Sequence, residues 1–234
     1  MPVALITGAS KGIGRSLAQL LSAKGYTLSL VARTETLLNS LLDELSVNGT
    51  NVKGFVGVVS DEEFVKGVVA ETAQHFGQID FLINNAGSGQ FGPVDSYTSE
   101  SWDQMFDTNV KGTFLFTQQV VSHMRTAGKG HILNIASDVA KRTFDGGAAY
   151  CATKYAQHAF SEAVRKEVRK DGIKVSVVYS GLVDTMFHAE PQGDASHADW
   201  LTGEDMARSI HFIMDQPAHV VIDELMIHPL SQPY

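Results

Sequence analysis

Cysteine is almost absent from this chain of 234 residues. Its one cysteine, Cys151, cannot form a disulfide within the chain. A lone cysteine is typical of proteins in a reducing compartment, so we expect a cytoplasmic protein. Basic residues are also in the minority, because 18 Lys and Arg stand against 26 Asp and Glu, for a formal net charge of −8. This acidic balance argues against nucleic acid or an anionic membrane surface as the main partner.

Long apolar segments are missing as well. No stretch approaches the roughly 18 consecutive apolar residues that a membrane-spanning helix needs. The run Val3–Ile6, which precedes Thr7 and Gly8, is too short for a signal-peptide core, so we expect no such leader. The remaining composition, 44% hydrophobic and 19% charged, is that of a globular protein. We expect a single domain, residues 1–234, because α/β proteins of this length often stay undivided.

Short apolar runs alternate with amphipathic stretches along the whole chain. Continuous Val, Ile and Leu runs are typical of a parallel sheet whose two faces are both covered by helices. The pattern predicts an α/β fold, a doubly wound Rossmann-type parallel sheet of about seven strands with helices on both faces. The expected strands are Val3–Thr7, Thr27–Ala32, Val52–Val59, Phe81–Asn84, His131–Ala136, Lys174–Tyr179 and Val220–Ile227. The expected helices are Ile13–Ala23, Leu37–Leu45, Glu62–His75, Glu100–Arg125, Ala149–Lys170 and Glu204–Met214.

A glycine-rich turn, TGASKGIG at residues 7–14, joins the first expected strand to the first helix. Gly8 permits a tight turn, Gly12 lets the backbone approach a pyrophosphate, and Gly14 lets the helix approach the sheet. The start of the helix then offers free N–H groups and a positive dipole end to phosphates. These glycines alone would also suit a plain strand–helix turn, but their place at the first βα junction favours a dinucleotide site. The expected cofactor contacts here are Gly8, Ser10, Lys11, Gly12, Ile13 and Gly14.

The end of the second expected strand bears on the choice between NAD and NADP. An acidic residue there usually binds the adenosine ribose 2′-OH, whereas an arginine favours a 2′-phosphate. Here Ala32 takes the acidic position and Arg33 follows it, while Lys11 adds a second cation. Arg33 can donate two N–H bonds to one phosphate. The alternative is that both side chains are ordinary solvated charges. We expect NADP(H).

Tyr150 and Lys154 lie four residues apart on an expected helix, which places them on one face. A free tyrosine has a pKa near 10, too high for ready proton exchange at neutral pH. The ammonium of Lys154 and an oxidised nicotinamide would both favour the phenolate. Lowering this pKa by about three units takes about 4 kcal/mol. Ser137 closes the strand that precedes this helix, so its hydroxyl is expected in the ligand crevice, where it can donate to a reacting carbonyl oxygen.

Together these motifs resemble the short-chain dehydrogenase/reductase family, and the match covers nearly the whole chain. Asn84-Asn85-Ala86-Gly87 resembles the family's strand-ending signature, from which Asn85, Ala86 and Gly87 are expected at the cofactor. Asn109, Ser137, Tyr150 and Lys154 fall on its catalytic tetrad. The resemblance implies that Lys154 also holds the nicotinamide ribose and that Asn109 positions a water linking Lys154 to solvent.

Two positions depart from the family pattern. Val58 stands where an acidic residue often lies near the adenine, so adenine is expected to rest on backbone and apolar contacts. The usual Pro-Gly after the sixth strand is Ser180-Gly181. The resemblance still implies that Gly181, Val183 and Thr185 contact the cofactor.

Other residues invite further interpretations. The histidines, above all His188 and His197 with Asp194 and Asp199, match no zinc signature, and the chemistry needs no metal, so none is expected. Cys151 is interpreted as a small buried residue. Basic residues gather near the ends of two helices, where they suit the helix dipole or form a docking patch for an acyl-carrier protein; they are Arg125, Lys129, Arg165, Lys166, Arg169 and Lys170.

Three loops are expected to frame the substrate: Ser88–Pro93, Asp138–Gly147 and Met186–Trp200, the last as a lid. They offer a mixed, mostly apolar lining of Gln90, Phe91, Val139, Phe144, Met186 and Phe187. We therefore expect an NADP(H)-dependent oxidoreductase that reduces a ketone or other carbonyl to an alcohol. A 3-oxoacyl thioester, a small ketone, a hydroxy acid and a pterin carbonyl all remain open. The alternative is a non-catalytic NADP(H)-binding sensor or scaffold on the same fold. The resemblance also implies a homodimer or homotetramer.

Overall fold

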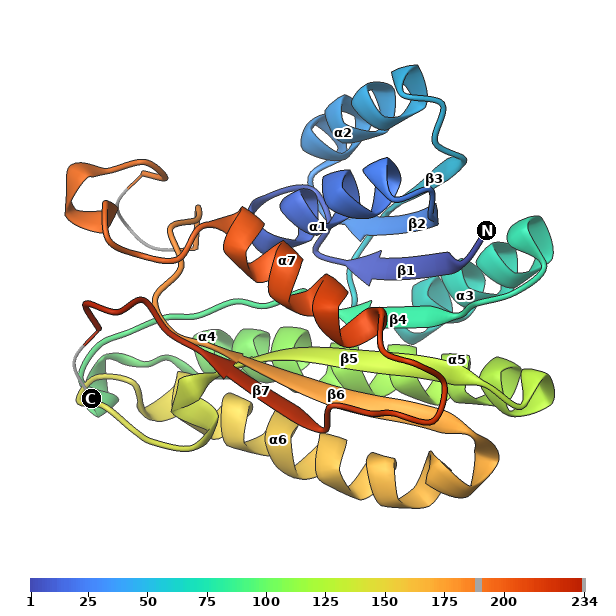
Figure 1. The fold of residues 1–234 in the computed structure, drawn as a ribbon. Coiled ribbons are helices and arrows are strands. Elements are labelled where there is room, and N and C mark those ends of the chain that lie inside the picture. Colours follow the sequence, from blue (N-terminus) through green and yellow to red (C-terminus); the bar gives the residue numbers. More distant parts are fainter. Residues whose placement is uncertain (188–190, 233–234) are drawn as a thin grey trace.

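The computed structural model describes residues 1–187 and 191–232 and contains one parallel sheet (Figure 1). The strand order is β3-β2-β1-β4-β5-β6-β7, and the predicted fold class is confirmed. The strands are β1 Val3–Thr7, β2 Thr27–Ala32, β3 Val52–Val56, β4 Phe81–Asn84, β5 Gly130–Ser137, β6 Ile173–Ser180 and β7 Glu224–Ile227. The helices are α1 Gly12–Ala23, α2 Glu35–Val47, α3 Glu62–Phe76, α4 Ser99–Phe106, α5 Gly112–Ala127, α6 Ala148–Val168 and α7 Gly203–Met214.

Both faces of the sheet carry a hydrophobic core, because successive side chains of a strand point to opposite faces. In β1, Ala4 and Ile6 pack with α1, α2 and α7, whereas Leu5 packs with α3, α5 and α6. Figure 1 shows α7 and α6 on opposite sides of β6 and β7. This double covering explains why the strand sequences are apolar at consecutive positions.

The expected helix Glu100–Arg125 is interrupted. It consists of α4 and α5, joined by a π-helical turn at Asp107–Lys111 that contains Asn109. Such turns widen a helix locally and occur often at functional sites. The two edge strands are also shorter than expected. β3 ends at Val56 rather than Val59, and β7 begins at Glu224 rather than Val220, since each edge strand is paired on one side only.

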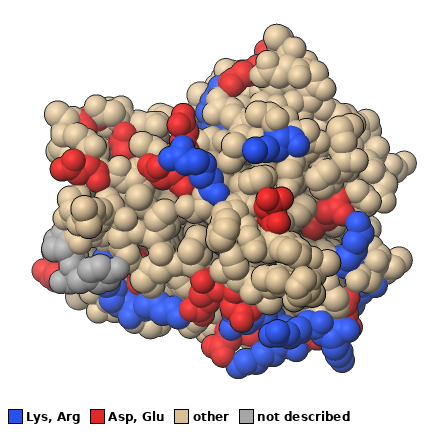
Figure 2. Space-filling model, in the orientation of Figure 1, with Lys and Arg blue, Asp and Glu red and all other residues tan. Residues whose placement is uncertain are grey.

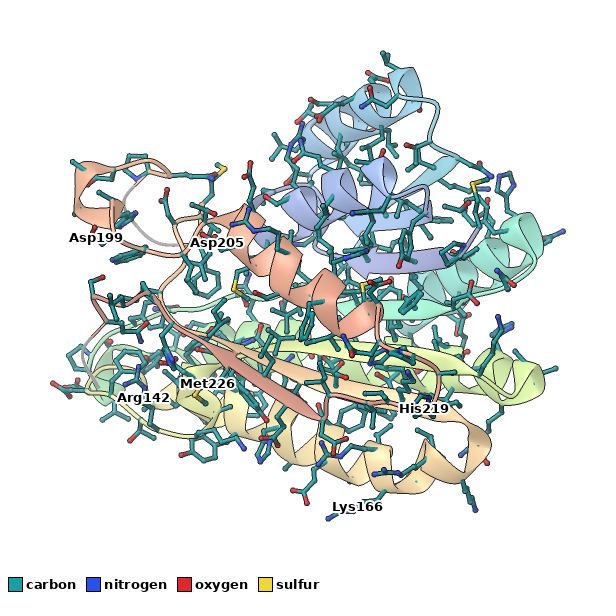
Figure 3. The ribbon with its side chains drawn as sticks, viewed as in Figure 1. Arg142, Lys166, Asp199, Asp205, His219 and Met226 are labelled. Atoms are coloured by element: carbon teal, nitrogen blue, oxygen red, sulfur yellow. The ribbon has the colours of Figure 1, made fainter. Side chains whose placement is uncertain are left out.

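The order of the strands reverses direction at β1, which lies between β2 and β4. In open α/β sheets the ligand crevice lies at such a switch point, outside the carboxyl ends of the strands. Figure 3 places Arg142 and Asp199 at this end of the molecule, and His219 at the opposite end of the sheet. Within residues 1–187 and 191–232, no helix has the length and apolar character needed to span a bilayer.

Candidate active site

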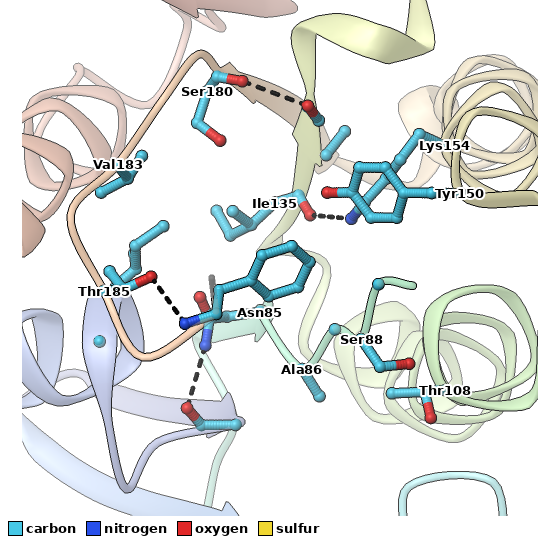
Figure 4. Close-up of a pocket in the computed structure, with 18 of the residues that line it drawn as sticks. Asn85, Ala86, Ser88, Thr108, Ile135, Tyr150, Lys154, Ser180, Val183 and Thr185 are labelled. Carbon is cyan, nitrogen blue, oxygen red and sulfur yellow. Dashed lines mark hydrogen bonds between the residues drawn. The ribbon is translucent and has the colours of Figure 1, made fainter. Parts of the chain in front are cut away.

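A cavity of about 700 Å³ opens at the carboxyl ends of the strands (Figure 4). It brings together most of the site residues predicted from the sequence, although they come from loops spread over the chain. Two predicted residues, Gly14 and Asn109, lie outside its lining. Those that line it are Gly8, Ser10, Lys11, Gly12, Ile13, Arg33, Asn85, Ala86, Gly87, Ser137, Tyr150, Lys154, Gly181, Val183 and Thr185.

The glycine turn has the shape of a phosphate cradle. Gly8 adopts a left-handed backbone, with φ of +65°. A Cβ on Gly14 would lie 2.3 Å from the carbonyl oxygen of Gly8, so this glycine permits close packing of α1 on the turn without touching the cavity. No side chain caps the N-terminus of α1, where Lys11 is the N-cap, and the cavity runs along residues 10–13. The free N–H groups and the bare backbone fit a dinucleotide phosphate.

Two cations lie at the end of the cavity nearest β2. Arg33 and Lys11 are exposed, and neither is paired with a carboxylate within the described part of the chain. Ala32, in the position of a ribose-binding acid, is buried and contributes no charge. A ligand that carries phosphate groups would meet only positive side chains here. Val58, which stands where the family often has an acidic residue, lies outside the cavity. Its neighbours Gly57 and Val59 line the cavity instead.

Tyr150 and Lys154 rise from one face of α6 into the cavity, and both are buried, at 9% and 4% exposure. The Lys154 Nζ lies 5.6 Å from the centre of the Tyr150 ring and donates to the carbonyl oxygen of Ile135 at 3.2 Å. Figure 4 shows this bond and the two side chains side by side. Ser137 Oγ, at the end of β5, lies 3.1 Å from a carboxylate oxygen of Asp138. The phenol of Tyr150, the amino group of Lys154 and the hydroxyl of Ser137 thus lie together on one wall of the cavity.

Burial changes the protonation of these groups in a direction that the sequence did not predict. It lowers the pKa of Lys154 to about 7. Burial also raises the pKa of Tyr150 above its ordinary value of 10, and the nearby carboxylate of Asp138 raises it further, although a hydrogen bond with Ser137 acts in the opposite direction. The raised pKa of Tyr150 is opposite in direction to the lowering expected from Lys154. A phenol with a raised pKa stays protonated at neutral pH.

Asn109 lies behind the cavity wall and holds the loop after β4. Its side chain accepts from the N–H of Ser88 and donates to the carbonyl oxygen of Ser88, both at 2.8 Å, and it also donates to Thr153. Two buried partners of this region, Gln157 and Thr113, were not predicted from the sequence. Gln157 lies three residues after Lys154, a helical spacing that marks it as a neighbour.

A second group missed from the sequence ties the site to residues near position 230. Asp138 accepts hydrogen bonds from Arg142, His228 and Gln232, and Gln232 also accepts from the backbone N–H of Leu182. A Cβ on Gly181 would lie 2.1 Å from Gln232 Oε1, so a side chain here would displace the Gln232 amide. No sequence signal links these residues, because about 90 positions separate Asp138 from His228.

Aromatic side chains that line the cavity pack around the Tyr150 ring. Phe91 meets it edge to face at 5.4 Å between ring centres, and Phe187 lies at 5.7 Å. Phe144 packs against Phe91 at 5.7 Å. These residues line the cavity together with Val139 and Met186, as the sequence predicts, whereas Gln90 does not.

The loop expected as a lid, residues 186–200, falls partly on residues 188–190, so His188 lies outside the described residues. Within the described part, His197 contacts the carboxylate of Asp184 at 3.0 Å and stacks on Trp200. Asp194 accepts from Ser196. No cluster of three potential metal ligands occurs within residues 1–187 and 191–232. Cys151 is buried, at 3% exposure.

The basic residues at the helix ends are largely neutralised. Arg125 pairs with Asp171, Lys129 with Asp80, Arg165 with Asp223 and Lys166 with Glu162. Figure 2 shows blue and red side chains next to each other along the α6 side of the molecule. These ion pairs favour the helix-end interpretation over an unbroken cationic patch.

The chain is similar to known proteins in both sequence and structure. The family model for short chain dehydrogenases matches residues 2–195. An uncharacterised oxidoreductase of Staphylococcus epidermidis is 34% identical over 230 residues, which is 97% of each chain. An alcohol dehydrogenase from the archaeon Thermococcus sibiricus, complexed with 5-hydroxy-NADP, superimposes with a TM-score of 0.94 at 29% identity, covering 100% of this chain and 99% of that one. A closed form of serine dehydrogenase with NADP+ gives 0.91 at 30% identity, covering 99% and 96%.

Proposed function

Because the chain belongs to the short-chain dehydrogenase family, we propose that it is an NADP(H)-dependent oxidoreductase that reduces a carbonyl compound to an alcohol. The observation that carries this proposal is one cavity with Ser137, Tyr150 and Lys154 on one wall and an uncapped helix start beside Arg33 on the other. Two similar structures hold NADP+ or a derivative of NADP, which supports the choice of cofactor. When bound, the cofactor would supply the hydride.

We assign a role in this reaction to Tyr150, Ser137 and Lys154 on the cavity wall and to Asn109 behind it. Tyr150 donates its phenolic proton to the carbonyl oxygen, for which its raised pKa keeps it protonated. Ser137 donates a hydrogen bond to the same oxygen as negative charge develops there. Lys154 holds the ribose next to the nicotinamide, and its ammonium stabilises the phenolate that remains after proton transfer. Asn109 acts from behind the wall, by fixing the Ser88 backbone at the cavity edge.

The substrate proposed from the aromatic lining is a medium-sized carbonyl compound with an apolar group. Phe91, Phe144 and Phe187 bury such a group beside Tyr150, as ligand pockets generally do. A ketone or a 3-oxoacyl thioester, two of the substrates left open, fits these rings better than a polyanion would.

The decisive experiment is an assay of NADPH and NADH oxidation with a panel of ketones, keto acids and 3-oxoacyl thioesters. We expect NADPH oxidation with at least one substrate and its loss in Tyr150→Phe. Tyr155→Phe, on the exposed side of the same helix, is the matched control and should retain activity. Cofactor binding without turnover of any substrate would instead favour the non-catalytic sensor or scaffold.

We also propose a homo-oligomer assembled through the outer faces of α5 and α6. Phe114 is 41% exposed on α5, and its ring lies 6.2 Å from that of Phe160 on α6. Exposed aromatic rings of this kind are enriched at interfaces. Light scattering should give a dimer or tetramer mass for the wild type and a smaller mass for Phe114→Glu. An acyl-carrier partner is tested separately, by comparing carrier-bound and free thioesters as substrates.

A further inference from the structure

A chain of buried hydrogen bonds runs from Lys154 to the π-helical turn. The Lys154 Nζ donates to Gln157 Oε1 at 2.8 Å, and Gln157 Nε2 donates to Thr113 Oγ1 at 2.9 Å. Thr113 Oγ1 in turn donates to the backbone carbonyl oxygen of Asn109 at 2.8 Å. Gln157 is 1% exposed and Thr113 is 3% exposed, so both lie in the interior.

The side-chain oxygen of Gln157 offsets part of the free-energy cost of burying the Lys154 ammonium. An ammonium has three N–H donors and no acceptor. Two of the Lys154 donors go to Ile135 O and Gln157 Oε1, and no described carboxylate pairs with Lys154. Because Lys154 lines the cavity, its third donor remains for a ligand. Without the Gln157 oxygen, the ammonium would lose one of its two protein acceptors and become harder to keep charged.

We propose that Gln157 is a positioning residue, which fixes the Lys154 ammonium at the edge of the cavity and favours its charged form, a role that rests on the oxidoreductase function proposed above. An apolar residue of the same size would fill this space in α6 but offer no acceptor. An amide does not release or take up protons near neutral pH. The amide of Gln157 in the hydrogen-bond chain to Asn109 therefore fixes Lys154 without itself carrying a proton.

The surroundings of Lys154 contain few other groups that titrate. Burial lowers the pKa of Lys154, and no charged neighbour contributes to that shift. On its own helix Tyr150 and His158 each lie one turn away, with Cys151 and Tyr155 nearby in the sequence, and His158 is hydrogen-bonded to Tyr179. Asp138, at the end of β5, lies near the Tyr150 hydroxyl. The π-helical turn carries Asp107 and Lys111, but both are exposed. A change in the protonation of Lys154 on substitution of Gln157 is thus attributable to the lost or altered contact.

The test measures the Lys154 amine directly by NMR on protein labelled with ¹³C at lysine Cε, with Lys154→Met to identify its signal. Gln157→Leu should lower the pKa of Lys154 by about one unit, because the charged form loses a hydrogen bond. Gln157→Glu should raise it by about one to two units, because a carboxylate favours the ammonium. Ser161→Ala is the control, since Ser161 binds the backbone oxygen of Gln157 and does not touch Lys154.

Kinetics complete the test with the best carbonyl substrate. The alkaline limb of kcat/KM should move down in Gln157→Leu and up in Gln157→Glu, and kcat of the Leu variant should fall about tenfold with the carbonyl KM unchanged. An unmoved lysine signal in both variants, or an equal shift in Ser161→Ala, overturns the proposal. So does a shifted signal without a shifted kinetic limb. If no substrate is turned over by the wild type while the lysine signals shift as expected, the failure belongs to the proposed function.

Discussion

Removal of the Arg33 side chain should change the choice between the two nicotinamide cofactors. Arg33 lines the cavity at the end of β2 and is exposed, with no carboxylate partner among the described residues. A hydrogen bond between charged groups contributes about 1.5–3 kcal/mol. Solvent screening at an exposed position calls for the lower end of this range, and about 1.4 kcal/mol corresponds to a factor of ten.

We therefore expect Arg33→Ala to lower kcat/KM for NADPH about tenfold and to leave the value for NADH unchanged. Ala32→Asp should act in the same direction and more strongly, because a carboxylate at this position repels a 2′-phosphate and binds a ribose 2′-OH. The assay is initial-rate kinetics with both cofactors and one carbonyl substrate. Lys11 keeps part of the phosphate affinity in both variants.

Arg15→Ala is the matched control, because it removes one positive charge from α1 outside the cavity. Arg15 pairs with Glu44 on α2 and does not line the site. An unchanged ratio of the two kcat/KM values in Arg33→Ala would refute the assignment of the 2′-phosphate. An equal change in Arg15→Ala would show that net charge alone sets the preference.

Three further predictions concern the framework of the site. Gly14→Ala should lower the free energy of unfolding by about 1–3 kcal/mol and weaken NADPH binding in a fluorescence titration, since the new Cβ would lie 2.3 Å from the Gly8 oxygen. Asn109→Ala should lower the free energy of unfolding in urea by about 2–4 kcal/mol, because the backbone N–H and carbonyl oxygen of Ser88 both lose their hydrogen bond to Asn109. Asn48→Ala, at the exposed end of α2, is the control and should lower it by less than about 1 kcal/mol. Burial lowers the pKa of His131 to about 3, below the unfolded value of about 6.5. Between these two pH values the unfolded state binds more protons than the folded state. The free energy of unfolding therefore falls as the pH drops below 6.5, by up to about 1.4 kcal/mol per pH unit. His131→Gln should flatten that dependence in thermal unfolding; an equally steep curve would exclude this histidine as its source.

The order of strands and helices was predictable because it depends on local patterns. Runs such as Leu28–Ala32 are apolar at consecutive positions, and their alternation with amphipathic segments predicts a parallel sheet covered on both faces. The edge strands were predicted too long, since hydrophobicity alone does not show where pairing with one neighbour stops. The π-helical turn around Asn109 was also missed, because an extra residue in a helical turn shifts the amphipathic pattern by only one position, which is hard to distinguish from its ordinary irregularity.

The candidate site also contains features that the sequence predicted and features that it did not. Spacing was enough to place Tyr150 beside Lys154 and to give Gly14 its role in packing α1. It was not enough to find Asp138, His228 and Gln232 together, because three separate segments meet there. The direction of the Tyr150 pKa was also beyond the sequence, since it depends on how completely the folded chain excludes water from the ring.

By itself, the sequence determined which residues lie on each strand and helix and which of them share a face, because backbone geometry repeats every two or 3.6 residues. That was sufficient for the doubly wound fold, the glycine turn and the pairing of a phenol with an ammonium. Only the tertiary structure decided that Gln157 accepts from Lys154, that Asn109 supports the cavity from behind, and that burial raises the pKa of Tyr150. Desolvation and contacts between distant segments exist only once the chain has folded, so no local pattern encodes them directly.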